Sequence, residues 1–224
     1  MSSNPRKRVH LLDDHPIVRC GLEAQLRRDP LLEIAGSHAT SRALLVAMSQ
    51  EPADVVITDF SLSSGEVDGL NLIRGLRSRF PKCKILVVSS HFNPATVSLA
   101  LQAGAHGFIG KSQPSEELVT AIHTVLRGRI YLHSNMAAEI AGISLEADTP
   151  HTRPTGLLEQ AKLSPREYEV LRCCLDGMST NAIAAKFSRQ ANTVSTQKKA
   201  AFRKLGIRTT NELFKMSHLL EGDS

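Results

Sequence analysis

The sequence predicts an α/β domain built on a parallel sheet, followed by a small all-α domain. Through about residue 127, short apolar runs alternate with segments whose apolar residues recur at helical spacing, which indicates βαβ units wound on both faces of a sheet. Between roughly 144 and 160 this periodicity stops, and prolines and polar residues are typical of a linker. Helical patterns then return without strands. We therefore expect domains over 1–143 and 161–224, joined by a linker over 144–160.

Short apolar runs mark the strands of the first domain. The expected strands are residues 9–12, 32–36, 55–58, 85–89 and 107–109. The expected helices between and after them are residues 17–26, 43–48, 70–80, 94–103 and 115–126. Five strands alternating with five helices match the flavodoxin-like, doubly wound order. A further short helix is expected over 135–143.

The second domain begins with a helix-start signal. Ser164-Pro165-Arg166-Glu167 combines an N-cap serine, a proline at the first helical position and a glutamate at the third, which is a capping box. Asp176-Gly177 ends this helix. A second helix is expected over 180–187, capped by Ser179 and with Ile183 and Ala184 facing inward, and a third over 192–205, with Gly206 as its C-terminal stop.

Acidic side chains follow two of the predicted strands. Asp13 and Asp14 come after the first apolar run, and Asp59 ends the third. Because chemistry in an open parallel sheet collects beyond the carboxyl ends of the strands, we expect these three carboxylates to meet in one pocket. Like charges at close range destabilise one another unless a cation neutralises them. A hard divalent ion that prefers oxygen ligands, Mg²⁺ above all, suits such a site.

A hydroxyl and an ammonium are expected at the same edge of the sheet. Ser89 ends the fourth apolar run and Lys111 follows the fifth. Both suit a phosphoryl group carried on a carboxylate, the first as a hydrogen-bond donor and the second as a charge partner. The plainer alternative is that these aspartates only form turns or cap helices, as Asp14 before His15-Pro16 could.

The order Asp-Asp, Asp, Ser, Lys resembles the receiver domain of two-component response regulators. The resemblance implies that Asp59 is the phospho-acceptor, with Ser89 as the switch hydroxyl, Lys111 as the partner of the phosphoryl group and Phe108 as the aromatic switch residue. It also implies a Mg²⁺ site made by Asp13, Asp14, Asp59 and the backbone carbonyl of Ser61. The sequence departs from the family pattern after the acceptor, because Ser63 stands where a proline is usual and Asp68-Gly69 arrive two residues late.

The second domain carries a positive charge that predicts a polyanionic partner. Residues 163–224 hold ten Lys or Arg against six Asp or Glu, and residues 177–211 hold seven basic residues and no acidic one. A basic run is most often only a solvated face. On a helical projection, however, Val194, Ala201 and Leu205 form a core stripe on one side of the third helix. The side chains on the opposite side are Thr196, Lys199 and Arg203. A short capped helix before such a basic helix is the helix-turn-helix arrangement, whose second helix enters the DNA major groove.

This half resembles the LuxR-type output domain of the NarL/FixJ response regulators. The shared motifs are Leu163-Ser-Pro-Arg-Glu, Gly177-Met-Ser, Ile183-Ala184, Thr193-Val194 and Lys204-Leu205-Gly206. The tract beginning at Thr193 and the long acceptor loop are most similar to the RcsB subgroup of capsule and envelope-stress regulators. The resemblance implies base contacts by Ser195, Thr196 and Lys199, and phosphate contacts by Thr193, Lys198 and Arg203. Gln190 stands where a Ser or Asn usually caps the recognition helix.

Composition excludes several classes of protein. No apolar run reaches membrane-spanning length, and the first residues lack the apolar core of a signal peptide, so a cytoplasmic protein is expected. The cysteines, at positions 20, 83, 173 and 174, show neither metal-ligand spacing nor a disulfide framework.

The sequence therefore predicts a DNA-binding transcription regulator, not an enzyme, that is switched by phosphorylation of Asp59. The expected partners are a histidine kinase or histidine phosphotransfer protein, promoter DNA and a second copy of the chain on activation, with an auxiliary co-regulator left open. One alternative is a regulator of the same architecture that acts without phosphorylation. Another is an aspartate-nucleophile phosphatase, which normally needs an acid two residues after the nucleophile, where Ser61 stands.

Overall fold

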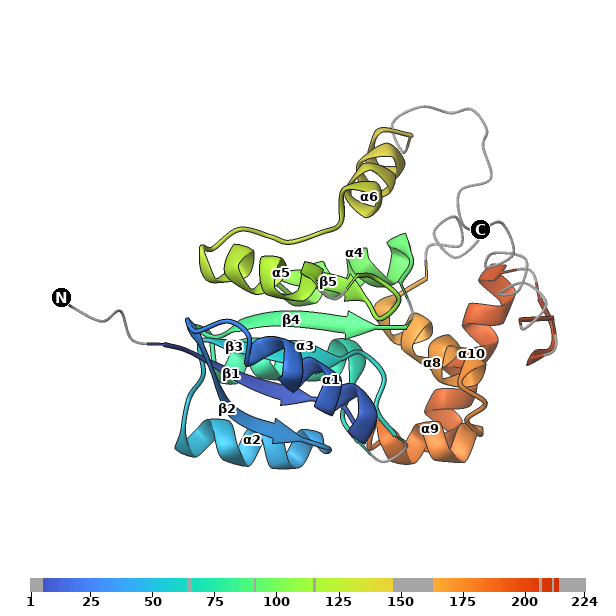
Figure 1. The fold of residues 1–224 in the computed structure, drawn as a ribbon. Helices are drawn as coiled ribbons and strands as arrows, with labels where there is room; N and C mark the ends of the chain where they lie inside the picture. The colour runs from blue at the N-terminus through green and yellow to red at the C-terminus, as the bar shows by residue number, and fades with distance from the viewer. Residues whose placement is uncertain are drawn as a thin grey trace. The chain divides into compact units, whose positions relative to one another are not determined.

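The computed structural model describes residues 6–63, 66–90, 92–114, 116–146, 163–205, 207–210 and 212–213. Two compact units are separated between Gly142 and Ile143 (Figure 1). Most of the linker expected over 144–160, and the expected helix stop at Gly206, lie outside the described residues.

The first unit contains a five-stranded parallel sheet in the order β2-β1-β3-β4-β5. Its strands are β1 Lys7–Leu12, β2 Leu32–His38, β3 Val55–Asp59, β4 Lys84–Ser89 and β5 Gly107–Gly110. The strand order reverses between β1 and β3, so the carboxyl ends of these two strands flank the topological switch point. The flavodoxin-like architecture expected from the sequence is confirmed.

Helices cover both faces of the sheet (Figure 1). They are α1 Pro16–Leu26, α2 Ser41–Gln50, α3 Gly69–Arg79, α4 Pro94–Ala103 and α5 Glu116–Leu126. Apolar residues of α2, α3 and α4 form one buried cluster with Val56 and Val87 of the sheet. Those of α1 and α5 form the other with Val55, Ile57 and Leu86. Because successive strand residues point to opposite faces, the strands supply both clusters, which explains their near-continuous apolar runs.

A sixth helix follows the receiver-like core. This helix, α6 Ser134–Glu146, includes the expected 135–143 and continues three residues into the expected linker. Tyr131 precedes it and forms a parallel bridge with Gly107 at the outer edge of β5. Met136 is buried in the cluster on the α2, α3 and α4 face. The edge strand is thereby covered by the chain that leads out of the sheet.

The described residues of the second unit form helices joined by short turns, without a strand. It contains α8 Pro165–Leu175, α9 Thr180–Lys186 and α10 Ala191–Leu205. Both halves of the capping box form, since Ser164 Oγ accepts from Glu167 N and Glu167 Oε2 accepts from Ser164 N. Ser179 caps α9 as expected. Val170, Ile183, Val194, Ala201 and Phe202 are among the buried residues that join the three helices.

Among the described helices, none is both long enough and apolar enough to cross a membrane.

Candidate functional site

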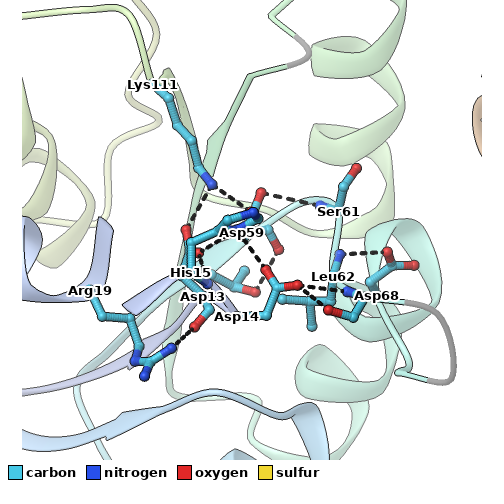
Figure 2. Close-up of polar contacts among 11 residues, drawn as sticks. Asp13, Asp14, His15, Arg19, Asp59, Ser61, Leu62, Asp68 and Lys111 are labelled. Carbon is cyan, nitrogen blue, oxygen red and sulfur yellow. Dashed lines mark hydrogen bonds and ion pairs between the residues drawn. The ribbon is translucent and has the colours of Figure 1, made fainter. Parts of the chain in front are cut away.

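The three expected carboxylates come together at the carboxyl edge of the sheet (Figure 2). Oxygen atoms of Asp13, Asp14 and Asp59, together with a ring nitrogen of His15, lie within 4.8 Å of one another. Lys111 Nζ reaches into this group from the end of β5 and lies 2.6 Å from Asp59 Oδ2 and 2.7 Å from Asp13 Oδ2. One ammonium therefore bridges the acid that follows β1 and the acid that ends β3.

Burial sets the charge balance of this acidic pocket. Asp13 is 1% exposed and Asp59 is 5% exposed. Burial raises the pKa of Asp59 above its ordinary value, and the charge of Asp13 adds to this, while the Lys111 contact opposes it. The pKa of Lys111 is raised, because its contacts with Asp13 and Asp59 outweigh the opposing effect of burial. The pocket thus holds more negative than positive charge away from water.

Asp14 belongs to the acidic pocket and binds the loop that follows Asp59, and it does not cap a helix. The N-cap residue of α1 is His15, and its own side chain makes no capping hydrogen bond. Asp14 Oδ2 instead accepts from the amide of Ser63 at 3.0 Å and from the Ser63 hydroxyl. Burial opposes ionisation of Asp14, but the Ser63 hydrogen bonds and the nearby His15 lower its pKa overall. The alternative that Asp14 only caps a helix is therefore wrong.

The long loop after Asp59 is tied at several points. Ser61 N donates to Asp59 Oδ1 at 3.2 Å, and Leu62 N donates to Asp68 Oδ2 at 2.8 Å. Glu66 Oε2 accepts from both the amide and the hydroxyl of Ser41, at 2.7 and 2.6 Å. Because Ser41 is the first residue of α2, Glu66 supplies the acid that this helix N-terminus favours.

The pocket suits a divalent cation. Asp14 Oδ1 is buried and accepts no hydrogen bond among the described residues; its near neighbour is His15 Nδ1 at 2.9 Å, an ion pair only when the imidazole is protonated. Carboxylate oxygens in excess of their donors are what Mg²⁺ takes as ligands. Asp13, Asp14 and Asp59 provide such oxygens. Of Ser61, the backbone amide contacts this group, at 3.2 Å from Asp59 Oδ1.

Ser89 lies on β4, the strand next to that of Asp59, and Phe108 lies one strand further out, on β5. Ser89 is fully buried as the last residue of β4, where its carbonyl accepts from Lys111 N at 2.8 Å. Phe108 is also fully buried, with its ring centroid 5.9 Å from that of Phe60 and 6.0 Å from that of Phe92. The amide of Phe108 donates to Tyr131 O at 3.2 Å. The expected switch residues thus lie between the pocket and the chain that leads to α6.

All the residues expected to contact DNA lie on α10, and four of the six are exposed. Thr193, Thr196, Lys199 and Arg203 are exposed, and Ser195 is half-buried. Lys198 differs from this group, because it is half-buried. Its Nζ donates to Thr210 at 3.0 Å and lies 5.3 Å from the centroid of the Phe202 ring. The expected core residues Val194 and Ala201 are buried, and Leu205 packs against them only partly buried.

Several residues of the first site were not singled out as site residues from sequence. Arg19 Nη1 donates to Asp13 O at 2.6 Å, and His15 N donates to Asp13 Oδ1 at 2.8 Å. Glu66 and Asp68 order the acceptor loop. His15 had a local signal, because it directly follows the two acids, whereas the partner of Glu66 lies 25 positions away in the chain.

Known families match both units of the chain. The response regulator receiver domain family matches residues 9–123, and the luxR family of bacterial regulatory proteins matches residues 161–217. The chain belongs to the two-component response regulators that join a receiver domain to a LuxR-type DNA-binding domain.

Relatives of this family match nearly the full length. The chain is 31% identical to the transcriptional regulatory protein RcsB of Escherichia coli (strain K12) over 89% of this chain and 88% of RcsB. It is 29% identical to the transcriptional regulatory protein MctR of Rhizobium johnstonii over 96% and 94% of the two chains. A solved structure of RcsB from Salmonella typhimurium has a TM-score of 0.79 at 30% identity, covering 95% and 96%.

One solved RcsB structure has promoter DNA bound. RcsB from Salmonella enterica serovar Typhimurium, bound to promoter rprA in the presence of the phosphomimetic BeF3−, has a TM-score of 0.75 at 29% identity. It covers 94% of this chain and 98% of that chain.

Proposed function

We propose that this protein is a transcription regulator whose binding to promoter DNA is switched by phosphorylation of Asp59. The observation that carries the proposal is the contact of Lys111 Nζ with both Asp59 and Asp13, at 2.6 and 2.7 Å, at the topological switch point of the sheet. The phosphate donor is a phosphohistidine on a sensor histidine kinase or a histidine phosphotransfer domain. The protein acts in the cytoplasm and is not an enzyme in its own right.

Asp59 is the acceptor because of where it lies among the three acids. It ends β3 without a neighbouring acid in sequence, and Lys111 already neutralises one of its oxygens. In the transfer, the N–P bond to the donor imidazole breaks and an O–P bond forms to a carboxylate oxygen of Asp59. The imidazole keeps the electron pair of the broken bond and takes up a proton. Lys111 then pairs with the new phosphoryl oxygens.

Mg²⁺ would be held by Asp13, Asp14, Asp59 and the Ser61 carbonyl, and it would neutralise charge on the incoming phosphoryl group. The chain's own residues order the remaining ligands. Ser63 holds Asp14, and the amide of His15 holds Asp13. A Mg²⁺-induced rise in melting temperature that Asp14→Asn removes would support this assignment, and an equal rise in both proteins would contradict it.

The change at Asp59 reaches the rest of the chain through two buried side chains. Ser89 turns its hydroxyl toward the phosphoryl group, and Phe108 moves within the cluster of Phe60 and Phe92. The response is formation of a homodimer, which places two α10 helices on adjacent half-sites of the promoter. RcsB bound to promoter DNA with a phosphomimetic supports this reading.

Ser195, Thr196 and Lys199 of α10 contact base edges, and Thr193, Lys198 and Arg203 contact phosphates. The exposure of Thr193, Thr196, Lys199 and Arg203 supports these assignments. Lys198 is half-buried, and its ammonium donates to Thr210 in the free protein. An auxiliary co-regulator would add a further partner.

The test is phosphorylation of the full chain by a small phosphodonor with Mg²⁺. Parent protein should acquire one acid-stable, base-labile phosphoryl group, and Asp59→Asn should acquire none. Asp54→Asn is the matched control, because Asp54 precedes the same strand but binds Lys7 and Arg8 at its opposite end. Labelling of Asp59→Asn at the parental level would overturn the acceptor assignment. DNA binding by Asp59→Asn equal to that of the phosphorylated parent would favour a regulator that acts without phosphorylation.

A further inference from the structure

A basic hollow lies at the C-terminal end of α10. It has a volume of about 520 Å³, and its lining residues are Lys199, Phe202, Arg203, Ile207 and Arg208. Three of these five side chains are cationic, and none is acidic. Lys199 and Arg203 lie one helical turn apart on the exposed face of α10, and Arg208 comes from the segment that follows the helix. Cations from two segments thus line one concave surface.

The three cationic side chains of the hollow have no partner within the described part of the chain. The side chains of Lys199, Arg203 and Arg208 make no hydrogen bond or ion pair to any described residue. Other basic residues of the same unit behave differently, since Lys204 binds Glu167 at 2.7 Å and Arg189 binds Gln197 at 3.2 Å. Nearby, the Glu212 carboxylate accepts hydrogen bonds from the backbone amide of Arg208 and from the Thr209 hydroxyl. It therefore binds the start of the turn that contains it.

The walls of the hollow favour an anion that accepts several hydrogen bonds. The planar guanidinium groups of Arg203 and Arg208 present donors in a fork that matches two oxygens of a phosphate. Phe202 is 7% exposed, and its ring with Ile207 forms an apolar wall that excludes water on one side. Charge-assisted hydrogen bonds are stronger where water is excluded.

We propose that this hollow receives a backbone phosphate of duplex DNA, and that Arg208 is a DNA-binding residue together with Arg203. The proposal rests on the DNA-binding function proposed above. DNA is the favoured source of the phosphate because the hollow continues the exposed face of α10 that carries Thr196 and Lys199. The alternative role for these cations is purely structural, since positive charge near a helix C-terminus stabilises the helix.

The experiment measures binding of the full chain to a random-sequence duplex over a salt series, because phosphate contacts do not depend on the base sequence. Each phosphate contact contributes about 0.9 to the slope of log affinity against log salt concentration. Arg208→Gln should reduce the slope by about that amount and weaken binding about eightfold at about 0.1 M salt. Arg203→Gln should act alike, and the double variant should lose about twice the slope.

Arg166→Gln is the matched control, because it removes the same charge from an exposed position on α8 outside the hollow. A slope reduced equally by Arg166→Gln would mean that net charge, and not the hollow, is responsible. An unchanged slope in Arg208→Gln, with or without a lower melting temperature, would also overturn the inference and would leave the structural role. Parent protein that shows no salt-dependent DNA binding would instead refute the proposed function.

A second measurement separates DNA phosphate from free phosphate. Inorganic phosphate is titrated into parent and Arg208→Gln protein and followed by phosphorus NMR. Phosphate binding that is lost in the variant, together with an unchanged DNA salt slope, would identify a free-anion site and overturn the inference.

Discussion

Removing the Lys111 ammonium should destabilise the receiver domain strongly. In Lys111→Met, the nearly buried carboxylates of Asp13 and Asp59 lose the cation that lies 2.7 and 2.6 Å from them. At an effective dielectric constant of about 20, each contact is worth roughly 6 kcal/mol before the cost of desolvating the charges. Loss of one partner from a buried ion pair costs about 3–5 kcal/mol. Because the Lys111 side chain is 19% exposed, we expect the lower end, about 3 kcal/mol.

Urea unfolding at neutral pH, without added divalent cation, measures this loss. The matched control is Lys82→Met, which removes an exposed lysine from the same domain and should change stability by less than about 0.5 kcal/mol. Adding Asp59→Asn to Lys111→Met removes one of the stranded charges, so the double variant should be more stable than Lys111→Met alone. A Lys111→Met protein as stable as Lys82→Met would refute the charge balance inferred for the acidic pocket.

The destabilisation should also depend on pH. The folded-state pKa of Asp59 lies above its model-peptide value of 3.8, so the folded chain holds this proton more tightly than the unfolded chain does. This group therefore makes stability fall as pH rises from 3.8 through the raised pKa. Without Lys111 that pKa rises further, so the deficit of Lys111→Met should be smaller at about pH 5 than at about pH 8. A deficit that grows on acidification would contradict this reasoning.

Three further substitutions test the second domain. Lys199→Ala should cost about 1–3 kcal/mol on a specific site and relax preference at one base position, which a binding-site selection with titrations would detect. Lys198→Ala should weaken binding to specific and random DNA nearly alike, and it should also lower the melting temperature, because the Lys198 ammonium binds Thr210 in the free protein. Equal effects of the two variants on both DNAs would mean that α10 is rotated differently in the groove. Ser164→Ala should destabilise the domain by about 1 kcal/mol in urea unfolding, since it removes the N-cap acceptor for Glu167 N. An unchanged unfolding midpoint would show that the capping box is not stabilising.

The periodicity of the sequence determined the fold. Apolar runs and helical stripes gave each strand and helix of the sheet domain to within a few residues, because residues buried on both faces of a parallel sheet form continuous apolar segments. The capping box at Ser164 and the cap at Ser179 could also be predicted, since both join residues three positions apart. The meeting of Asp13, Asp59 and Lys111 followed from topology, because the carboxyl ends of parallel strands share one edge.

Only the tertiary structure decided the contacts between segments that are distant in sequence. Glu66 binds Ser41 at the start of α2, and Ser63 binds Asp14, so the two-residue-longer loop is held by partners that no local pattern indicates. On α10, a helical projection separates buried from exposed positions but cannot show that Lys198 bends back to Thr210. It also cannot place Arg208, which lies beyond the helix, beside Arg203. Side-chain partners across a turn or loop depend on where the backbone returns, and that position is set by packing of the whole domain.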